Sequence, residues 1–169
     1  MNILETQRLL LRHLSTNDSE FLIELLNDPT FIQNIGDRGV RTIADAHAYV
    51  RNGPAASYAK NGFGLSLVIL KETSESIGIC GLIKRDALED VDIGYAFLPR
   101  YWSMGYAVES TLAVKKYAKD VIGLKRMVAI VDPNNFSSIR VLEKIGFTFE
   151  KMVRLSEDDI DLKLFATTL

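Results

Sequence analysis

The sequence predicts an α+β protein built on a mixed sheet of about seven strands with about four flanking helices. Two patterns support this prediction. Residues 63–70 and 76–84 form apolar runs around a short polar turn, which indicates an antiparallel hairpin. Residues 90–131 contain a strand, a helix and a second strand in succession, which indicates a parallel crossover. The length of 169 residues suits one domain that spans 1–169.

Before the hairpin, the sequence predicts one strand and then two helices. Residues 6–14 have the apolar density of a strand, and the first helix begins with Ser15 or Thr16 as its N-cap. Pro29 marks the end of this helix, because proline interrupts helical hydrogen bonding. Thr42 has an acidic residue three positions later, which is the pattern of a capping box, so a second helix starts there. A Gly-Pro pair interrupts it, and a short helical piece follows.

The strand at residues 90–98 alternates between two kinds of side chain. Its apolar positions are Val91, Ile93, Tyr95 and Phe97, and the positions between them are Asp92, Gly94 and Ala96. Successive side chains of a strand point to opposite faces, so the apolar set is expected to face the core. The other face carries small or polar residues and leaves room beside it.

After this strand, a helix is expected from Gly105 to about Val121, with Gly123 as its C-terminal cap. Its expected buried stripe consists of Val108, Leu112 and either Val114 or Ala118. Residues 124–131 form the next strand, and a helix over 135–146 follows it. The last two predicted strands are 147–155 and 159–169.

Composition and charge argue against several classes of protein. The formal net charge of −2 does not suit a surface that coats nucleic acid, and no uncharged run is long enough to cross a membrane. The N-terminal residues lack the apolar segment of a signal peptide. The one cysteine, Cys80, lies in an apolar strand, and the two histidines lack metal-ligand spacing. We expect a cytoplasmic monomer or homodimer with no metal site and no nucleic-acid or membrane partner.

The junction between the strand at 90–98 and the following helix is a candidate anion site. The first N–H groups of a helix lack intrahelical partners, and the helix dipole adds partial positive charge there. Gly105 and Ala107 leave the backbone open to a phosphate at alternate positions. Taken alone, one glycine at a helix start is more typical of a plain turn.

Longer segments carry a specific resemblance. The stretch FLPRYWSMGYAVES resembles the cofactor loop of the GNAT-superfamily N-acetyltransferases, whose pattern is Q/R-x-x-G-x-G/A. Gly105 and Ala107 match its last two fixed positions, whereas Trp102 replaces the Gln or Arg. The RimJ/RimL-like ribosomal-protein-alanine N-acetyltransferases have this tryptophan, in a loop that typically reads YWGKGYATEA. Ser103 and Met104 stand where that loop has Gly and Lys.

Three further segments agree with this branch in order and spacing. They are ETQRLLLRHLSTND, which resembles TeRLxLRpl…D, DIGYAF, which resembles EIGYWL, and NFSSIRVLEKIGF, which resembles NxxSxRVLEKLGF. The resemblance spans nearly the whole chain. It implies the GNAT-like acyl-CoA N-acyltransferase fold, with a sheet splayed between its fourth and fifth strands. It also implies an N-acetyltransferase that uses acetyl-CoA.

The resemblance further implies where CoA binds. Backbone amides between Ser103 and Val108 are expected to hold the pyrophosphate. This cofactor-binding stretch consists of Ser103, Met104, Gly105, Tyr106, Ala107 and Val108. Backbone atoms of Phe97 and Leu98 are expected to pair with the pantetheine, and an N–H near Phe97 is expected to polarise the thioester carbonyl. Asn135 matches an asparagine expected near the pantetheine, and it also suits an N-cap.

Two residues are candidates for proton transfer. Asp92 lies on the small-residue face and matches a glutamate of the branch, so it is the expected base, directly or through water; a solvated strand charge is the alternative. Many family members use a tyrosine as the acid, but Leu142 occupies that position here. Ser138 matches a serine proposed to interact with the thiol; the alternative is a hydroxyl bonded to its own helix.

The acceptor is left open between a protein N-terminal amine and a small-molecule amine. The region 31–60 is expected to shape its site, and the loop over 36–42 is a candidate lid. Arg38 and Arg41 in this loop make an acceptor with a carboxylate or with backbone groups one option. The rival function is a non-catalytic acyl-CoA-binding sensor. A third interpretation is an α+β domain with no CoA site.

Overall fold

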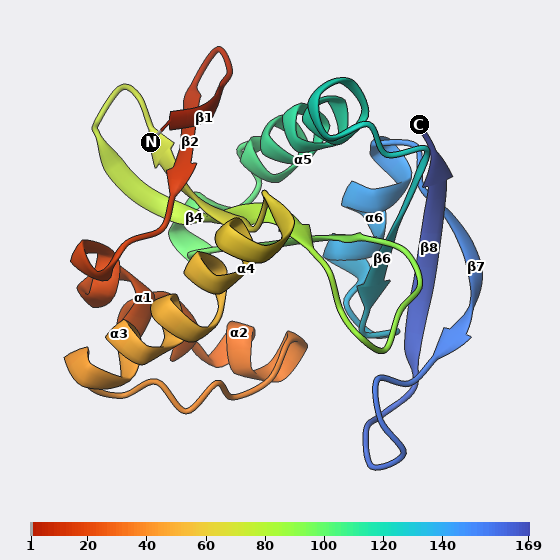
Figure 1. Ribbon diagram of the computed structural model, residues 1–169, viewed down its shortest axis with the longest axis horizontal. Coiled ribbons are helices and arrows are strands. Elements are labelled where there is room, and N and C mark those ends of the chain that lie inside the picture. The colour runs from red at the N-terminus through yellow and green to blue at the C-terminus, as the bar shows by residue number, and fades with distance from the viewer. Residues whose placement is uncertain (1) are drawn as a thin grey trace.

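A computed structural model describes residues 2–169 as one eight-stranded sheet with helices on both faces (Figure 1). The strand order is β1-β2-β3-β4-β5-β6-β8-β7, and β5 and β6 are the parallel pair of neighbours. The strands are β1 (Asn2–Glu5), β2 (Leu9–His13), β3 (Leu65–Leu70), β4 (Glu75–Ile83), β5 (Asp92–Phe97), β6 (Arg126–Val131), β7 (Thr148–Val153) and β8 (Leu162–Thr168). The mixed α+β sheet is confirmed, with eight strands where about seven were predicted.

The additional strand arises because the N-terminal segment forms a hairpin rather than one strand. β1 and β2 pair antiparallel, and the Thr6 N–H donates to the Leu9 carbonyl at 2.9 Å to close the turn. The apolar pattern of residues 6–14 marked β2 correctly. β1 lacks a distinct pattern of its own, because it lies at the sheet edge and is only partly buried.

Six α-helices replace the four or so that were predicted. They are α1 (Ser19–Leu26), α2 (Pro29–Asn34), α3 (Ile43–Asn52), α4 (Pro54–Asn61), α5 (Tyr106–Tyr117) and α6 (Phe136–Lys144). Proline ends one helix and begins the next at both Pro29 and Pro54, because its missing N–H is not needed in a first turn. The predicted caps are confirmed: Ser15 caps the short 3-10 turn Thr16–Asp18, and Thr42 caps α3.

The buried face of α5 differs from the prediction. Leu112 was expected in the buried stripe but is 46% exposed, whereas Ser110 and Thr111 are fully buried. Their hydroxyls donate to the carbonyls of Tyr106 and Ala107 one turn earlier, at 2.8 and 2.6 Å. Because these hydroxyls form hydrogen bonds within the helix, Ser110 and Thr111 can be buried against the sheet. The buried face of α5 therefore includes them and excludes Leu112. A π-helical turn, Ala118–Ile122, completes the helix before Gly123 in the left-handed region.

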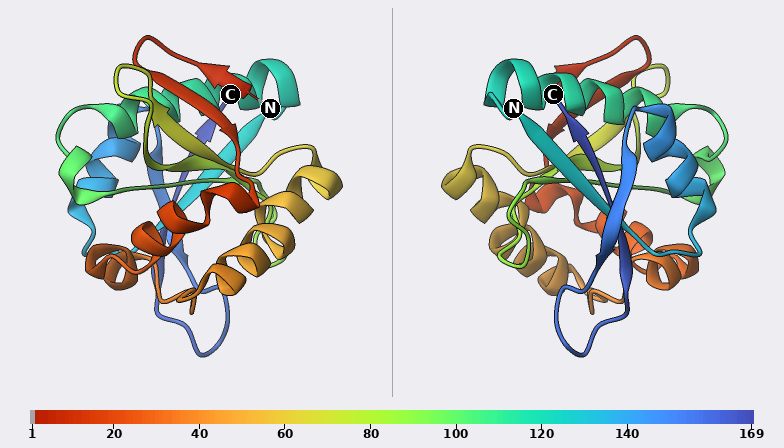
Figure 2. Two further views of the ribbon diagram at one scale, coloured as in Figure 1. Left: turned by 90° about the vertical axis from the view of Figure 1, so that its left-hand side faces the viewer. Right: turned by 90° about the vertical axis from the view of Figure 1, so that its right-hand side faces the viewer.

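The two larger of three apolar clusters lie on opposite faces of the sheet. Alternate residues of β3 and β4 separate between them: Val68 and Cys80 belong to the core under α5 and α6, and Leu67 and Ile79 to the core under α1–α3. Figure 2 shows α5 across one face and the N-terminal helices gathered on the other. The two faces of β5 therefore look toward different helices.

The sheet splays between β5 and β6. Among the described residues these strands share one register pair, Asp92 with Val128, where the Val128 N–H donates to the Val91 carbonyl at 3.0 Å. The remaining residues of β5 pair with β4 alone. The fourth and fifth predicted strands, at 90–98 and 124–131, correspond to β5 and β6, so their predicted separation is confirmed. The separation leaves the backbone groups along one edge of β5 without a neighbouring strand.

Candidate active site

A cavity of about 360 Å³, here called the first cavity, lies between the end of β5, the start of α5 and the start of α6. Most of the residues expected to bind cofactor line it, namely Phe97, Ser103, Gly105, Tyr106, Ala107, Val108 and Asn135. Leu98 and Met104 do not. Leu98 is 1% exposed, and its N–H donates to the Ile77 carbonyl at 3.0 Å, so that its backbone continues the sheet toward β4.

The start of α5 is an open helix terminus. Gly105 is the N-cap with φ of +82°, a conformation that side chains other than glycine rarely adopt, and it provides no side-chain cap. The first N–H groups of the helix are therefore available to an anion in the cavity. Ser103 also has a positive φ, 62°, at the position where the resembling loop has glycine.

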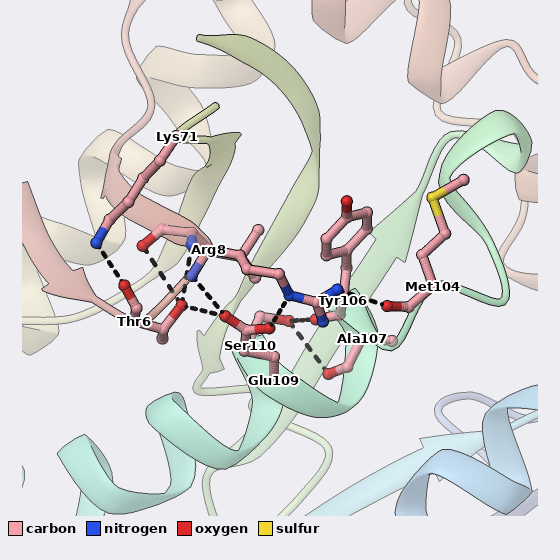
Figure 3. A network of polar contacts seen from close by, with 9 residues as sticks. Thr6, Arg8, Lys71, Met104, Tyr106, Ala107, Glu109 and Ser110 are labelled. Carbon is pink, nitrogen blue, oxygen red and sulfur yellow. Dashed lines mark hydrogen bonds and ion pairs between the residues drawn. The ribbon is translucent and has the colours of Figure 1, made fainter. Parts of the chain in front are cut away.

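Arg8, from the first hairpin, contacts the segment that precedes α5 (Figure 3). The Arg8 guanidinium donates to the Met104 carbonyl at 2.9 Å and to Glu109 at 2.7 Å, and it lies 4.5 Å from the centre of the Tyr106 ring. Thr6 donates to the other Glu109 oxygen at 2.7 Å. These bonds tie the helix start to the turn between β1 and β2, and we call the four side chains and the Met104 carbonyl the Arg8 clamp.

The Arg8 clamp also determines the ionisation and the orientation of the Glu109 carboxylate. Burial alone would raise its pKa, but the bonds from Thr6 and from the Arg8 backbone and side chain outweigh burial and lower the pKa. Glu109 is absent from the residues that line the first cavity. The Glu109 carboxylate is thus ionised, paired with Arg8 and turned away from the predicted anion site.

Aromatic and basic residues surround the mouth of the first cavity. The Trp102 indole donates to the Phe97 carbonyl at 2.8 Å, so the tryptophan braces the end of β5 against the loop. Arg140 and Lys144 of α6 line the cavity one turn apart. Arg100 instead forms an exposed ion pair with Glu24 at 2.6 Å.

A second cavity, of about 170 Å³, adjoins the first along β5 and extends toward α3, β4 and β6. All of β5 from Asp92 to Ala96 contributes to its lining. The alternation predicted for this strand is confirmed by the two cores, because Val91, Ile93, Tyr95 and Phe97 belong to or pack on one and Ala96 packs on the other. Asp92 is 1% exposed, and the Arg85 guanidinium donates to it at 3.1 Å. Burial raises the pKa of Asp92 to about 6, because the loss of hydration outweighs the Arg85 charge.

The two cavities share part of their walls, and Tyr95, Asn135 and Ser138 line both, together with Ala96 and with Phe31, Asn34 and Ile35 on the α2 side. The Tyr95 and Ser138 hydroxyl oxygens lie 2.6 Å apart, and this contact joins β5 to α6 across the splay. Asn135 accepts a bond from the Ser138 N–H at 3.2 Å and so caps α6. Burial raises the pKa of Tyr95, so its hydroxyl stays protonated and can donate.

Sequence reasoning missed three residues that the structure brings to the site. Tyr95 was predicted to face the core, and its ring does pack there. The contact of its hydroxyl with Ser138 was not predicted. Arg8 belongs to the segment that resembles the family's opening, so that signal was available. Arg85 sits in a polar loop, and nothing in its neighbourhood along the chain indicates that it meets Asp92.

Several other side chains are placed away from the chemistry. Burial raises the pKa of the Cys80 thiol to about 12, so it is unreactive near neutral pH. Leu142, at the family's tyrosine position, is 1% exposed and belongs to the core. Within residues 2–169, no cluster of three metal-ligating side chains occurs. No helix of that range is long and apolar enough to span a bilayer.

Comparisons with known proteins agree with this geometry. Residues 8–148 match the model of the acetyltransferase (GNAT) domain family. The Bacillus subtilis (strain 168) protein YkkB is 35% identical over 159 residues, which cover 89% of this chain and 88% of YkkB. A GNAT-family acetyltransferase from Bacillus anthracis superposes with a TM-score of 0.81 at 28% identity, covering 99% of this chain and 98% of its own.

A more distant structural neighbour shares the fold alone. RimL, a ribosomal L7/L12 alpha-N-protein acetyltransferase solved in complex with coenzyme A, superposes with a TM-score of 0.85 at 18% identity. The superposition covers 100% of this chain and 98% of RimL. The family model spans most of the chain, and both the splay and the open start of α5 lie within it. The chain belongs to the GNAT acetyltransferase family.

Proposed function

We propose that the protein transfers the acetyl group of acetyl-CoA to a primary amine, either a protein N-terminus or a small molecule, by direct attack of the amine. The observation that carries this proposal is the meeting of two cavities at Tyr95, Asn135 and Ser138. One cavity opens on an uncapped helix start, and the other contains a buried carboxylate. The first cavity suits the cofactor, and the second cavity, which adjoins it, suits the acceptor.

The first cavity fits CoA by its chemistry. The N–H groups that follow Gly105 suit a pyrophosphate, and Arg140 and Lys144 on the facing helix supply positive charge at the cavity wall. The open edge of β5 suits the amides of the pantetheine, because backbone groups that leave a sheet need new partners. Acetyl-CoA contributes the thioester that the amine attacks.

The second cavity supplies a route for the proton of the amine. An ammonium group has to lose its proton before it can attack a thioester carbon. Asp92, with its pKa raised to about 6, remains largely ionised near neutral pH and accepts a proton more readily than an ordinary aspartate does. In this proposal Asp92 takes the proton directly or through water, and a C–N bond forms as the C–S bond breaks.

The junction supplies the proton for the leaving group. The CoA thiolate has to be hydrogen-bonded or protonated as it departs. Ser138 is the proposed donor, and Tyr95 can replace that proton because the two hydroxyl oxygens are 2.6 Å apart. This arrangement takes the place of the tyrosine that is lacking at Leu142.

The proposal is tested by the release of CoA thiol from acetyl-CoA in the presence of a panel of primary amines, with CoA affinity measured by calorimetry. Turnover on at least one amine is expected, and both Asp92→Asn and Ser138→Ala should slow it while leaving CoA affinity close to normal. Asp86→Asn removes an exposed carboxylate from the neighbouring loop and serves as the control.

The outcomes separate the alternatives. Tight CoA binding without turnover on any amine would replace this proposal with a non-catalytic sensor of acyl-CoA. Absence of CoA binding would leave an α+β domain without a CoA site and would contradict the assignment of the first cavity.

A further inference from the structure

The second cavity carries four charged side chains, and two of them, Arg38 and Asp132, form no ion pair with any residue from 2 to 169. They are Arg38, Arg85, Asp92 and Asp132. Arg85 is bonded to Asp92, and Asp132 accepts the Asn134 N–H at 2.8 Å. No ion pair joins Arg38 to any residue from 2 to 169.

The neighbouring arginine on the same loop behaves differently. Arg41 is paired with Asp37 at 2.6 Å and donates to the Asn27 side chain at 2.5 Å, and it does not line the cavity. The loop between α2 and α3 is thus anchored by Arg41, while Arg38 is available at the wall of the second cavity. A guanidinium in that position can bind a carboxylate in bidentate fashion.

A tyrosine and apolar walls complete the surroundings of Arg38. Tyr49 of α3 lines the same cavity, and its hydroxyl is a neutral donor because burial raises its pKa. Much of the remaining wall is apolar, including Phe31, Ile83, Leu155 and Leu162. The cavity therefore suits a small ligand with an apolar body and few polar groups.

We propose, on the basis of the proposed function, that the acceptor is a small amino acid with an apolar side chain, whose carboxylate is bound by Arg38 and Tyr49 while its amine approaches Asp92. The formal charges at the cavity sum to zero, which suits a zwitterion. A polyamine would meet two arginines, and a polyanion would meet two aspartates, so both are disfavoured.

The test compares leucine with 3-methylbutylamine, which lacks only the carboxylate, and with leucinamide, which keeps a neutral carbonyl group. The wild-type protein should show a higher kcat/KM for leucine than for the other two. Arg38→Gln should lower kcat/KM for leucine about 10- to 100-fold, the value of one charge-assisted hydrogen bond, and change kcat/KM for the two amines without a carboxylate little. Arg51→Gln removes an exposed charge from α3, outside the cavity, and is the matched control.

A binding measurement makes the inference independent of turnover. Ligand-observed NMR on the CoA-loaded protein should detect N-acetylleucine more strongly than N-acetyl-3-methylbutylamine, and Arg38→Gln should abolish the difference. Equal binding of the two compounds, or a preference that survives Arg38→Gln, would overturn the inference. Preference for leucinamide and for peptides that begin with leucine would overturn it in favour of a protein N-terminus.

The two proposals fail in different ways. Arg38-dependent binding of N-acetylleucine without turnover on any amine would contradict the proposed function but support the carboxylate site. Turnover on amines without any preference for a carboxylate would support the proposed function and remove the carboxylate site.

Discussion

Burial of the Asp92 carboxylate destabilises the folded protein near neutral pH, and Asp92→Asn tests how much. The pKa of Asp92 rises from 3.8 to about 6, mainly through burial and against the opposing charge of Arg85. Each pH unit between these values corresponds to about 1.4 kcal/mol, so the full effect on the free energy of unfolding is about 3 kcal/mol.

The sign of the effect follows from proton binding. The folded protein holds the Asp92 proton more tightly than the unfolded chain does, so between about pH 4 and pH 6 the unfolded chain loses its proton first. This group therefore lowers stability progressively as the pH rises through that window. Above the window the full destabilisation of about 3 kcal/mol is present.

Urea unfolding of wild type and Asp92→Asn from pH 4 to pH 8 measures the effect. An amide does not titrate, so the difference in free energy of unfolding should shift in favour of Asp92→Asn by about 3 kcal/mol across the series. Removing the partner of Arg85 adds an offset that does not change this slope. Asp86→Asn, an exposed carboxylate of the same loop, controls for net charge. Parallel pH profiles for wild type and Asp92→Asn would refute the reasoning.

The same substitution should also lower activity. Wild-type kcat/KM is expected to fall on the acidic side with a midpoint near pH 6, as Asp92 becomes protonated. Asp92→Asn should have a low rate without this acidic limb. A variant that kept the wild-type limb would show that Asp92 is not the base.

Four further predictions concern the cofactor side and the core. Gly105→Glu strains a φ of +82° and brings its Cβ to 3.2 Å from an Arg8 guanidinium nitrogen, which should displace the start of α5, so calorimetry should show CoA affinity reduced more than about tenfold; unchanged affinity would rule out the phosphate site. Arg8→Met removes the bond to the Met104 carbonyl and should raise the Kd for CoA about three- to tenfold with the KM for the amine unchanged. Ser103→Gly relieves a positive φ and should stabilise the protein by about 0.5–1 kcal/mol in urea unfolding, and a loss of stability would contradict this. Cys80 should react with a thiol reagent only after unfolding, and rapid labelling of the native protein would disprove its burial.

Local patterns predicted the parts of the fold that depend on neighbours along the chain. The capping box at Thr42 and the alternation of β5 both involve residues at most a few positions apart, and both are confirmed. The separation of the strands at 90–98 and 124–131 followed from resemblance to a family, and the structure confirms it. The additional strand β1 and the self-satisfied hydroxyls of Ser110 and Thr111 had no such local signal.

By itself, the sequence determined the family, the splayed sheet, the open helix start at Gly105 and the face of β5 that carries Asp92. Only the tertiary structure decided which side chains meet there. Arg8 reaches Glu109 across 101 positions, and Tyr95 reaches Ser138 across 43. These contacts depend on how the two halves of the sheet and the helices between them are oriented, and that orientation is set by packing of the whole core rather than by any short segment.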